Sequence, residues 1–180
     1  MKIEPLSLAD AVLIAPEIHG DSRGFFYESW RQDRYAELGV GPEFVQDNHS
    51  RSGRGVLRGL HYQLAKPQGK LVRAVVGEIY DVIVDLRRSS PTFKQWAGVT
   101  LSADNHAMLW VPPGFAHGFQ VISEVAEITY KCTVFYAPDD EQTLLWDDAD
   151  LAIDWPLQAA PVLSAKDQQG RRLKDALTYP

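Results

Sequence analysis

The chain of 180 residues has one cysteine, Cys132, so it can form no disulfide bond within itself. It also lacks any apolar run near the roughly 20 residues that cross a membrane. The first residues, MKIEPLSLADAVLIAPEIHGD, hold only a short apolar run among early acids and prolines, unlike a signal peptide. These shortages favour a soluble protein of a reducing compartment, and we expect it in the cytoplasm, without a membrane partner.

Positive charge is scarce as well. Lys and Arg total 18 against 24 Asp and Glu, giving a net charge of -6. This balance argues against a general nucleic-acid binder, although one local basic pocket for an anion would be compatible with it. The length and the 45% hydrophobic content fit one globular domain, which we expect to span residues 1–180.

Most of the chain is predicted to form short β-strands. The segment 69–87 is rich in Val and Ile, and turn signals such as PPG and APDD separate the runs. Strands at this spacing predict a sandwich or barrel, for which a jelly roll is the best candidate. The other expected strands lie in AVLIAPEI, GFFYESW, EFVQDNHS, QWAGVTLS, HAMLWVPP, HGFQVIS, EVAEITYKCTVFY and QTLLWDD.

Alternation and helix signals add detail. In the second half of segment 69–87, one parity holds Tyr80, Val82, Val84 and Leu86, and the other holds Asp81, Asp85 and Arg87. A helix is expected over about 31–38, ending at Gly39 as a C-cap, and the polar tail from Ser164 allows one short helix.

Five histidines make a metal site worth testing. Metal-binding cupins carry His-x-His and a later histidine after Pro-x-Gly, and this chain resembles them only in the later part, PPGFAHGF, which contains His117. The position two after His61 is Gln63, a weaker ligand for Zn or Fe than imidazole. We therefore expect no metal.

His61, in GVLRGLHYQ, is open to two other interpretations. Taken alone it is more often a hydrogen-bonded core histidine, but in a partly desolvated cavity it suits a general base. Tyr130 shares the parity of Ile128 and Cys132, so its hydroxyl faces an apolar interior and needs a partner or a task. Lys70 opens the long strand segment, where a lone lysine is more often simply solvated.

Polar residues gather at two other places. Arg23 lies in a Gly-flanked turn with Glu28 five residues later, and FVQDNHS brings together Gln46, Asp47, Asn48, His49 and Ser50. Such clusters suit hydrogen bonds to a polar ligand, and they equally suit Asx-turns. Arg58, on an apolar strand, calls for a carboxylate or phosphate partner.

The motifs taken together resemble the dTDP-4-dehydrorhamnose 3,5-epimerase family, cupin-like enzymes of dTDP-L-rhamnose synthesis. The resemblance covers nearly the whole chain, and its specificity comes from the order of many motifs. They are DSRGFFYES, FVQDNHS, GVLRGLHYQ, QGKLV, DVIVDLRRSSPTF, PPGFAHGF, TYKCT, WDD, IDWP and LSAKD. The resemblance implies a mainly β, double-stranded β-helix or jelly-roll barrel with a few short helices.

Catalytic roles follow from the resemblance residue by residue. His61 resembles the base, and Asp167 is similar to the carboxylate that raises its basicity. Tyr130 resembles the acid that returns a proton from the opposite face, and Lys70 the residue that steadies the enolate oxygen. The positions implied to bind substrate are Arg23, Phe26, Glu28, Gln46, Asp47, Asn48, Arg58, Lys70, His117, Glu141 and Lys166, with Phe135 as a further aromatic candidate beside the base of the nucleotide.

The implied reaction is epimerisation at C3 and C5 of dTDP-4-dehydro-6-deoxy-D-glucose, giving dTDP-4-dehydro-L-rhamnose. The C4 ketone acidifies both neighbouring carbons, so a base, an opposite-face acid and a group facing the C4 oxygen suffice, without redox cofactor or metal. Two alternatives stay open. One is a 3- or 5-epimerase of an antibiotic sugar pathway, and the other is a non-catalytic or metal-binding cupin.

One conflict remains within the sequence. Strict alternation places Arg58 and His61 on opposite faces of a strand, while the resemblance assigns both to one ligand. A bulge at Gly59, a reach around the sheet edge, or a neighbouring subunit would each reconcile them. The family is dimeric, which implies a homodimer in which Arg23 and Glu28 complete the partner's site.

Overall fold

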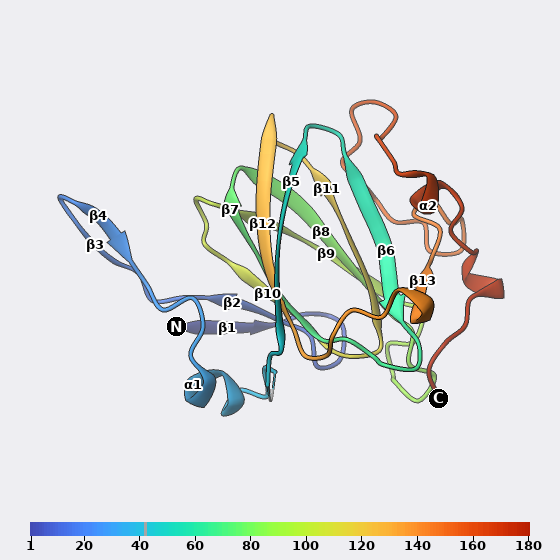
Figure 1. The fold of residues 1–180 in the computed structure, drawn as a ribbon, viewed down its shortest axis with the longest axis horizontal. Coiled ribbons are helices and arrows are strands. Elements are labelled where there is room, and N and C mark those ends of the chain that lie inside the picture. The colour runs from blue at the N-terminus through green and yellow to red at the C-terminus, as the bar shows by residue number, and fades with distance from the viewer. Residues whose placement is uncertain (42) are drawn as a thin grey trace.

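The computed structural model describes residues 1–41 and 43–180 and consists mainly of β-strands, which confirms the predicted fold class (Figure 1). The strands are β1 (Lys2–Pro5), β2 (Val12–Ala15), β3 (His19–Asp21), β4 (Gly24–Phe26), β5 (Gln46–Gly53), β6 (Leu57–Gln63), β7 (Lys70–Val76), β8 (Glu78–Asp85), β9 (Trp96–Ser102), β10 (Met108–Val111), β11 (Phe115–Val121), β12 (Val125–Cys132) and β13 (Glu141–Thr143). The helices are α1 (Gln32–Ala36) and α2 (Ala165–Gln168), with 3-10 turns η1 (Pro138–Asp140) and η2 (Leu173–Asp175).

Two antiparallel sheets face each other in a jelly-roll arrangement. One has the strand order β1-β2-β10-β7-β12-β5, and the other β13-β6-β11-β8-β9. Each order has two end strands, so the two sheets of the jelly roll are not closed into one continuous barrel. The site must therefore be assembled from two separate walls.

Apolar side chains fill the space between the sheets. Val72 of β7, Ile83 of β8 and Ile128 of β12 are almost fully buried in this inner cluster. Burying such side chains is worth about 1.5–3 kcal/mol each, so the cluster fixes the spacing of the two walls.

The outer faces of the sheets are covered too. Leu57 and Val84 pack beneath Trp155 of the C-terminal segment, while Tyr35 of α1 packs on Met108 outside the six-stranded sheet. The strands are therefore buried on both sides, which weakens the alternation that distinguishes core from solvent.

Strand β8 shows the effect of this double burial. The parity that contains Val82 and Val84 packs in the outer cluster, whereas Ile83 packs between the sheets. Asp81 and Asp85 share the parity of Ile83, and neither is exposed to solvent. The side of β8 that carries Asp81 and Asp85 thus faces the interior.

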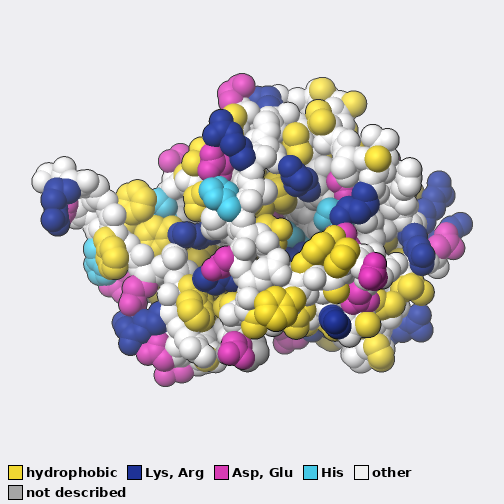
Figure 2. Space-filling view, viewed as in Figure 1, with side chains coloured by type: hydrophobic (Ala, Val, Ile, Leu, Met, Phe, Trp, Pro, Cys, Tyr) yellow, Lys and Arg dark blue, Asp and Glu magenta, His cyan; other side chains and the backbone are white. Residues whose placement is uncertain are grey.

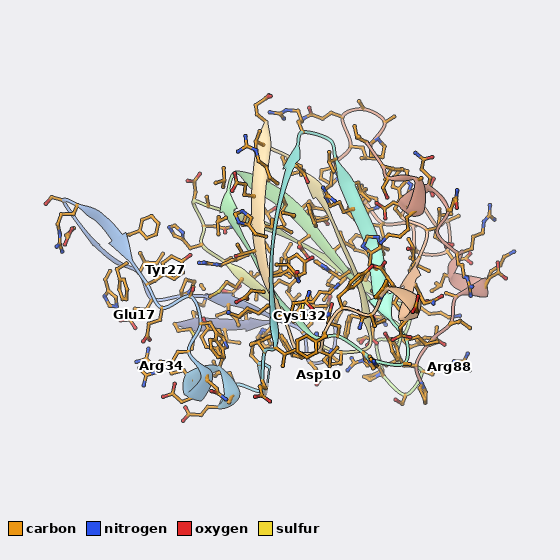
Figure 3. All side chains as sticks on the ribbon, viewed as in Figure 1. Asp10, Glu17, Tyr27, Arg34, Arg88 and Cys132 are labelled. Carbon is orange, nitrogen blue, oxygen red and sulfur yellow. The ribbon has the colours of Figure 1, made fainter. Side chains whose placement is uncertain are left out.

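The N-terminal region confirms one expectation and adds two strands. Helix α1 lies within the predicted 31–38 and is shorter, and Gly39 adopts a φ of +71° in the turn that follows it. Strands β1 and β3 were not predicted. Strands β3 and β4 form a hairpin arm that extends from the body, and Tyr27 lies at the base of the arm (Figure 3).

The C-terminal segment contains the expected short helix, α2, whose N-cap is Ser164. Among the described residues no helix has the length and apolarity to cross a bilayer.

Candidate active site

A cavity of about 300 Å³ lies between the two sheets. Figure 2 shows Lys, Arg and His side chains around a hollow on the face that Figure 1 places between β5 and β6. The predicted site residues that line the cavity are Gln46, Asn48, Arg58, His61, Lys70, His117, Tyr130, Glu141 and Lys166.

Arg58 and His61 both line the cavity because β6 changes phase between them. Leu57 and Leu60 differ in parity, yet both pack in the outer cluster. The register of β6 against β11 shifts at the same point, and Gly59 has a φ of +127°, which favours glycine. The bulge at Gly59, one of the three explanations considered above, is confirmed.

His61 pairs with Asp167 across 106 residues of sequence. The distance between His61 Nε2 and Asp167 Oδ1 is 2.6 Å. Ser164, the N-cap of α2, donates from Oγ to Asp167 Oδ2 at 2.7 Å. Burial alone would raise the pKa of Asp167, but the hydrogen bonds from His61 and Ser164 outweigh it and hold that pKa below its usual value. The carboxylate thus orients the ring through Nε2 and leaves Nδ1 to accept a proton.

Tyr130 and Lys70 belong to the opposite wall, since β12 and β7 are neighbours in the six-stranded sheet while His61 is on the five-stranded one. Burial raises the pKa of Tyr130 and lowers that of Lys70, because each charged form is poorly solvated there. Among the described residues the Tyr130 hydroxyl has no hydrogen-bond partner. Tyr130 therefore differs from a structural core tyrosine, whose hydroxyl would donate to a backbone carbonyl.

His117 forms a second, fully enclosed pair at the cavity. Its Nε2 lies 2.9 Å from Asp81 Oδ1 and 3.0 Å from Oδ2. Burial lowers the pKa of His117, and the attraction of Asp81 offsets only part of this effect. A neutral His117 donates from Nε2 to Asp81.

Glu141 and Lys166 form a salt bridge on another side of the cavity. Lys166 Nζ donates to Glu141 Oε2 at 2.7 Å, and the Tyr136 hydroxyl donates to the same oxygen at 3.0 Å. Burial would raise the pKa of Glu141, but Lys166 and neighbouring donors hold it below its usual value. Phe135, the further aromatic candidate, is 68% exposed and does not line the cavity.

Strand β5 divides its predicted ligands between two faces. Gln46 and Asn48 face the cavity, and Gln46 Nε2 donates to Asn48 Oδ1 at 3.0 Å. Asp47 lies on the other face, where it accepts from Lys131 Nζ at 2.9 Å and borders a different hollow. Within one chain, Asp47 is not brought to the cavity.

The residues of the hairpin region also lie outside the cavity of their own chain. Arg23 pairs with Asp21 beside the hairpin turn, and Phe26 is 67% exposed. Glu28 pairs with Arg34 at the base of the arm. Within one chain, none of these three predicted contacts lines the site cavity.

Sequence reasoning missed several polar groups of the site. Gln68 and Tyr136 line the cavity, and Asp81 holds His117. Ser50, which the sequence placed in the FVQDNHS cluster, lines the cavity too. Tyr136 ends the expected strand EVAEITYKCTVFY and has the parity of Tyr130, but the prediction of a strand up to Tyr136 is wrong, because β12 ends at Cys132 and irregular backbone follows.

In the part of the chain that the structure describes, no three His, Cys, Asp or Glu side chains converge as a metal-ligand set.

Comparison with known proteins agrees with this geometry. A family model described as dTDP-4-dehydrorhamnose 3,5-epimerase matches residues 5–175. The Pseudomonas aeruginosa protein of that name is 57% identical over the full length of both chains.

Solved structures are similar as well. A Legionella pneumophila dTDP-6-deoxy-D-glucose-3,5-epimerase in complex with dTDP-4-keto-L-rhamnose has a TM-score of 0.93 and 51% identity, covering 96% of this chain and 93% of that one. A 3'-monoepimerase from Streptomyces bikiniensis in complex with dTDP-quinovose has a TM-score of 0.89 and 34% identity, covering 94% and 87%. Both the sequence match and the fold lead to one assignment: the chain belongs to the dTDP-4-dehydrorhamnose 3,5-epimerase family.

Proposed function

We propose that this protein converts dTDP-4-dehydro-6-deoxy-D-glucose to dTDP-4-dehydro-L-rhamnose by inverting C3 and C5, as a step of dTDP-L-rhamnose synthesis. The observation that carries the proposal is the placement of His61 and Tyr130 on opposing walls of one cavity. Inversion at carbon needs removal of a proton from one face and delivery to the other.

His61 is the base in this scheme. Its Nδ1 takes the proton from a carbon next to the C4 ketone, and Asp167, 2.6 Å from Nε2, stabilises the imidazolium that forms. Asp167 has its own support from Ser164, so the ring orientation is set before substrate binds.

Lys70 faces the negative charge that develops on the C4 oxygen. A cation held in a poorly solvated cavity interacts with that charge much more strongly than it would in water. Because the pKa of Lys70 is lowered by the same burial, the charged form that stabilises the enolate is lost earlier as the pH rises.

Tyr130 is the acid on the second face. Burial raises the pKa of its hydroxyl, so it stays protonated at neutral pH and can deliver a proton to the enolate carbon. The two proton transfers involve no net oxidation or reduction, so the chemistry needs no redox cofactor.

Binding of the diphosphate falls to cations. Arg58, whose Nε donates to Ser52 Oγ at 3.0 Å, and Lys166 line the cavity. A guanidinium held at one nitrogen still presents its other donors to phosphate oxygens.

We also propose a homodimer in which the hairpin arm of one chain completes the cavity of the other. Arg23, Phe26 and Glu28 lie on or beside the arm and do not line their own cavity, and the arm extends from the body. A two-fold interface would exchange the arms reciprocally.

We further propose that residues 1–180 form one domain, because Asp167 of the tail completes a site built on the sheets. We also propose that the protein acts in the cytoplasm, where a free Cys132 stays reduced.

The function is tested by exchange in D2O with dTDP-4-dehydro-6-deoxy-D-glucose, followed at C3 and C5 by NMR. Deuterium at both carbons, with formation of the L-sugar, is the expected result. Deuterium at one carbon would indicate a monoepimerase, the activity named for the Streptomyces bikiniensis relative, and none at either would refute the proposal. In Tyr130→Phe we expect exchange to continue while inversion slows, because abstraction precedes delivery from the second face.

A further inference from the structure

Residues 134–137 connect β12 to η1 and will be called the 134–137 link (Figure 3 labels Cys132, the last residue of β12). The link forms no strand, and side-chain amides hold its backbone. Gln63, the last residue of β6, accepts from Ala137 N at its Oε1 (2.9 Å) and donates from Nε2 to Phe135 O (3.4 Å). Its Nε2 also donates to Lys66 O at 3.0 Å, so the carboxamide, 3% exposed, is fully engaged.

Two more glutamines hold the same link. Gln46 Oε1 accepts from Tyr136 N at 2.8 Å, and Gln68 Nε2 donates to Val134 O at 2.7 Å. Three side chains from three different segments thus fix four consecutive residues. Gln46 and Gln68 line the cavity, but Gln63 lies behind it.

The link places Tyr136 at the mouth of the cavity. The Tyr136 side chain lines the cavity while the residue remains 50% exposed, and its hydroxyl donates to Glu141 Oε2. The same oxygen accepts from Lys166. A shift of the link would therefore move an aromatic wall and loosen Glu141 together.

We propose that Gln63 is a positioning residue of the epimerase reaction, acting through Tyr136. Gln63 forms hydrogen bonds with the backbone of Phe135 and Ala137, on either side of Tyr136. These bonds fix both the position and the direction of the Tyr136 side chain. The role rests on the function proposed above, because Tyr136 matters only if the cavity holds the reacting sugar. Misplacement of a wall by about 1 Å can cost about a hundredfold in rate.

The test is Gln63→Met, which keeps the length of the side chain and removes all three hydrogen bonds. We expect amide hydrogen exchange at Ala137 to speed up about tenfold or more, the effect of losing one hydrogen bond of ordinary strength, and kcat/KM to fall by a similar or larger factor. Gln63→Glu keeps the acceptor for Ala137 N but places a buried carboxylate against the carbonyl oxygens of Lys66 and Phe135, so it should lose at least as much as Gln63→Met.

Tyr62→Phe is the matched control. Tyr62 precedes Gln63 on β6 and points outward, where its hydroxyl donates to Leu177 O. Loss of the Tyr62 hydroxyl removes a buried hydrogen bond from the same strand. This substitution should leave both amide hydrogen exchange at Ala137 and kcat/KM unchanged. An equal loss of kcat/KM in this control would mean that the effect is general destabilisation.

A double substitution tests whether Gln63 affects kcat/KM through Tyr136 or independently of it. In a Tyr136→Ala background, Gln63→Met should cause no further loss of kcat/KM, since the group that it positions is gone. An additive loss, or faster exchange with unchanged kcat/KM, would overturn the proposal. If the wild-type protein shows no turnover, the proposed function is refuted instead. If amide exchange at Ala137 is unchanged in Gln63→Met, Gln63 does not hold the 134–137 link, whatever reaction the protein catalyses.

Discussion

Arg58 and His61 face the same cavity although three positions separate them on one strand. The register of β6 shifts against β11 between these residues, where Gly59 lies opposite Gly118. The proposed cation for the diphosphate and the proposed base for the sugar therefore come from one short stretch of chain, at a spacing that a regular strand would not allow.

Gly59→Ala should destabilise the fold. A Cβ at Gly59 would lie 2.5 Å from the Cα of Gly118, and the φ of +127° already disfavours a side chain. Strain and overpacking together predict a loss of about 2–5 kcal/mol in the free energy of unfolding, measured by urea denaturation. Gly24→Ala is the control, because Gly24 has a φ of +129° and open space around it. Equal losses in the two variants would show that the close approach of β6 to β11 is not the cause.

His61→Ala should abolish deuterium exchange at both C3 and C5, since it removes the base. Asp167→Asn keeps the shape of the pair but loses the charge that stabilises the imidazolium, and kcat should fall by about 10²–10⁴. His49→Ala is a matched control. It also breaks a histidine–carboxylate pair, with Glu127 at 2.9 Å, yet it lies outside the cavity. Exchange that persists in His61→Ala would exclude His61 as the base.

The pH dependence of kcat/KM should report Lys70. The charged form stabilises the enolate, and burial puts the pKa of Lys70 below the ordinary lysine value of 10.5, so activity should decline on the alkaline side before a free lysine would titrate. Tyr130 has a raised pKa and loses its proton later. In Lys70→Arg the alkaline limb should move to higher pH, because a guanidinium keeps its charge. A limb that stays in place would assign it to another group.

Mixing two inactive variants tests whether the hairpin arm serves a second chain. Arg23→Ala and His61→Ala are each expected to be nearly inactive. If arms are exchanged, half of the dimers in an equal mixture pair one chain of each kind, and each mixed dimer has one intact cavity. About a quarter of wild-type activity should return. If the arm serves its own chain, every cavity in the mixture carries one substitution and no activity returns.

The sequence predicted the strands well because their Val- and Ile-rich runs end at strong turn signals. It predicted less about which face of a strand is inside. Asp81 and Asp85 occupy the inner parity of β8, and specific partners stabilise each one: His117 of β11 for Asp81, and Arg87 and Ser90 just beyond β8 for Asp85. Burial of a carboxylate depends on such partners, and alternation alone does not reveal them.

Motifs predicted part of the site. Motif order pointed to His61, Asp167, Lys70 and Tyr130, and the structure brings all four to one place, but the motif residues Arg23, Phe26, Glu28 and Asp47 do not line the cavity of their own chain. Tyr136 was missed as a site residue although it ends an expected strand, because its actual position depends on hydrogen bonds from glutamines distant in sequence.

The pairing of His61 with Asp167 also has a consequence for biosynthesis. The two residues are 106 positions apart, so at translation rates of about 5–20 residues per second the histidine precedes its carboxylate by roughly 5 to 20 seconds. During that interval β7, β8, β11 and β12 are synthesised, while the helix that carries Asp167 does not yet exist. The pair can therefore form only after α2 has been made and lies against β6.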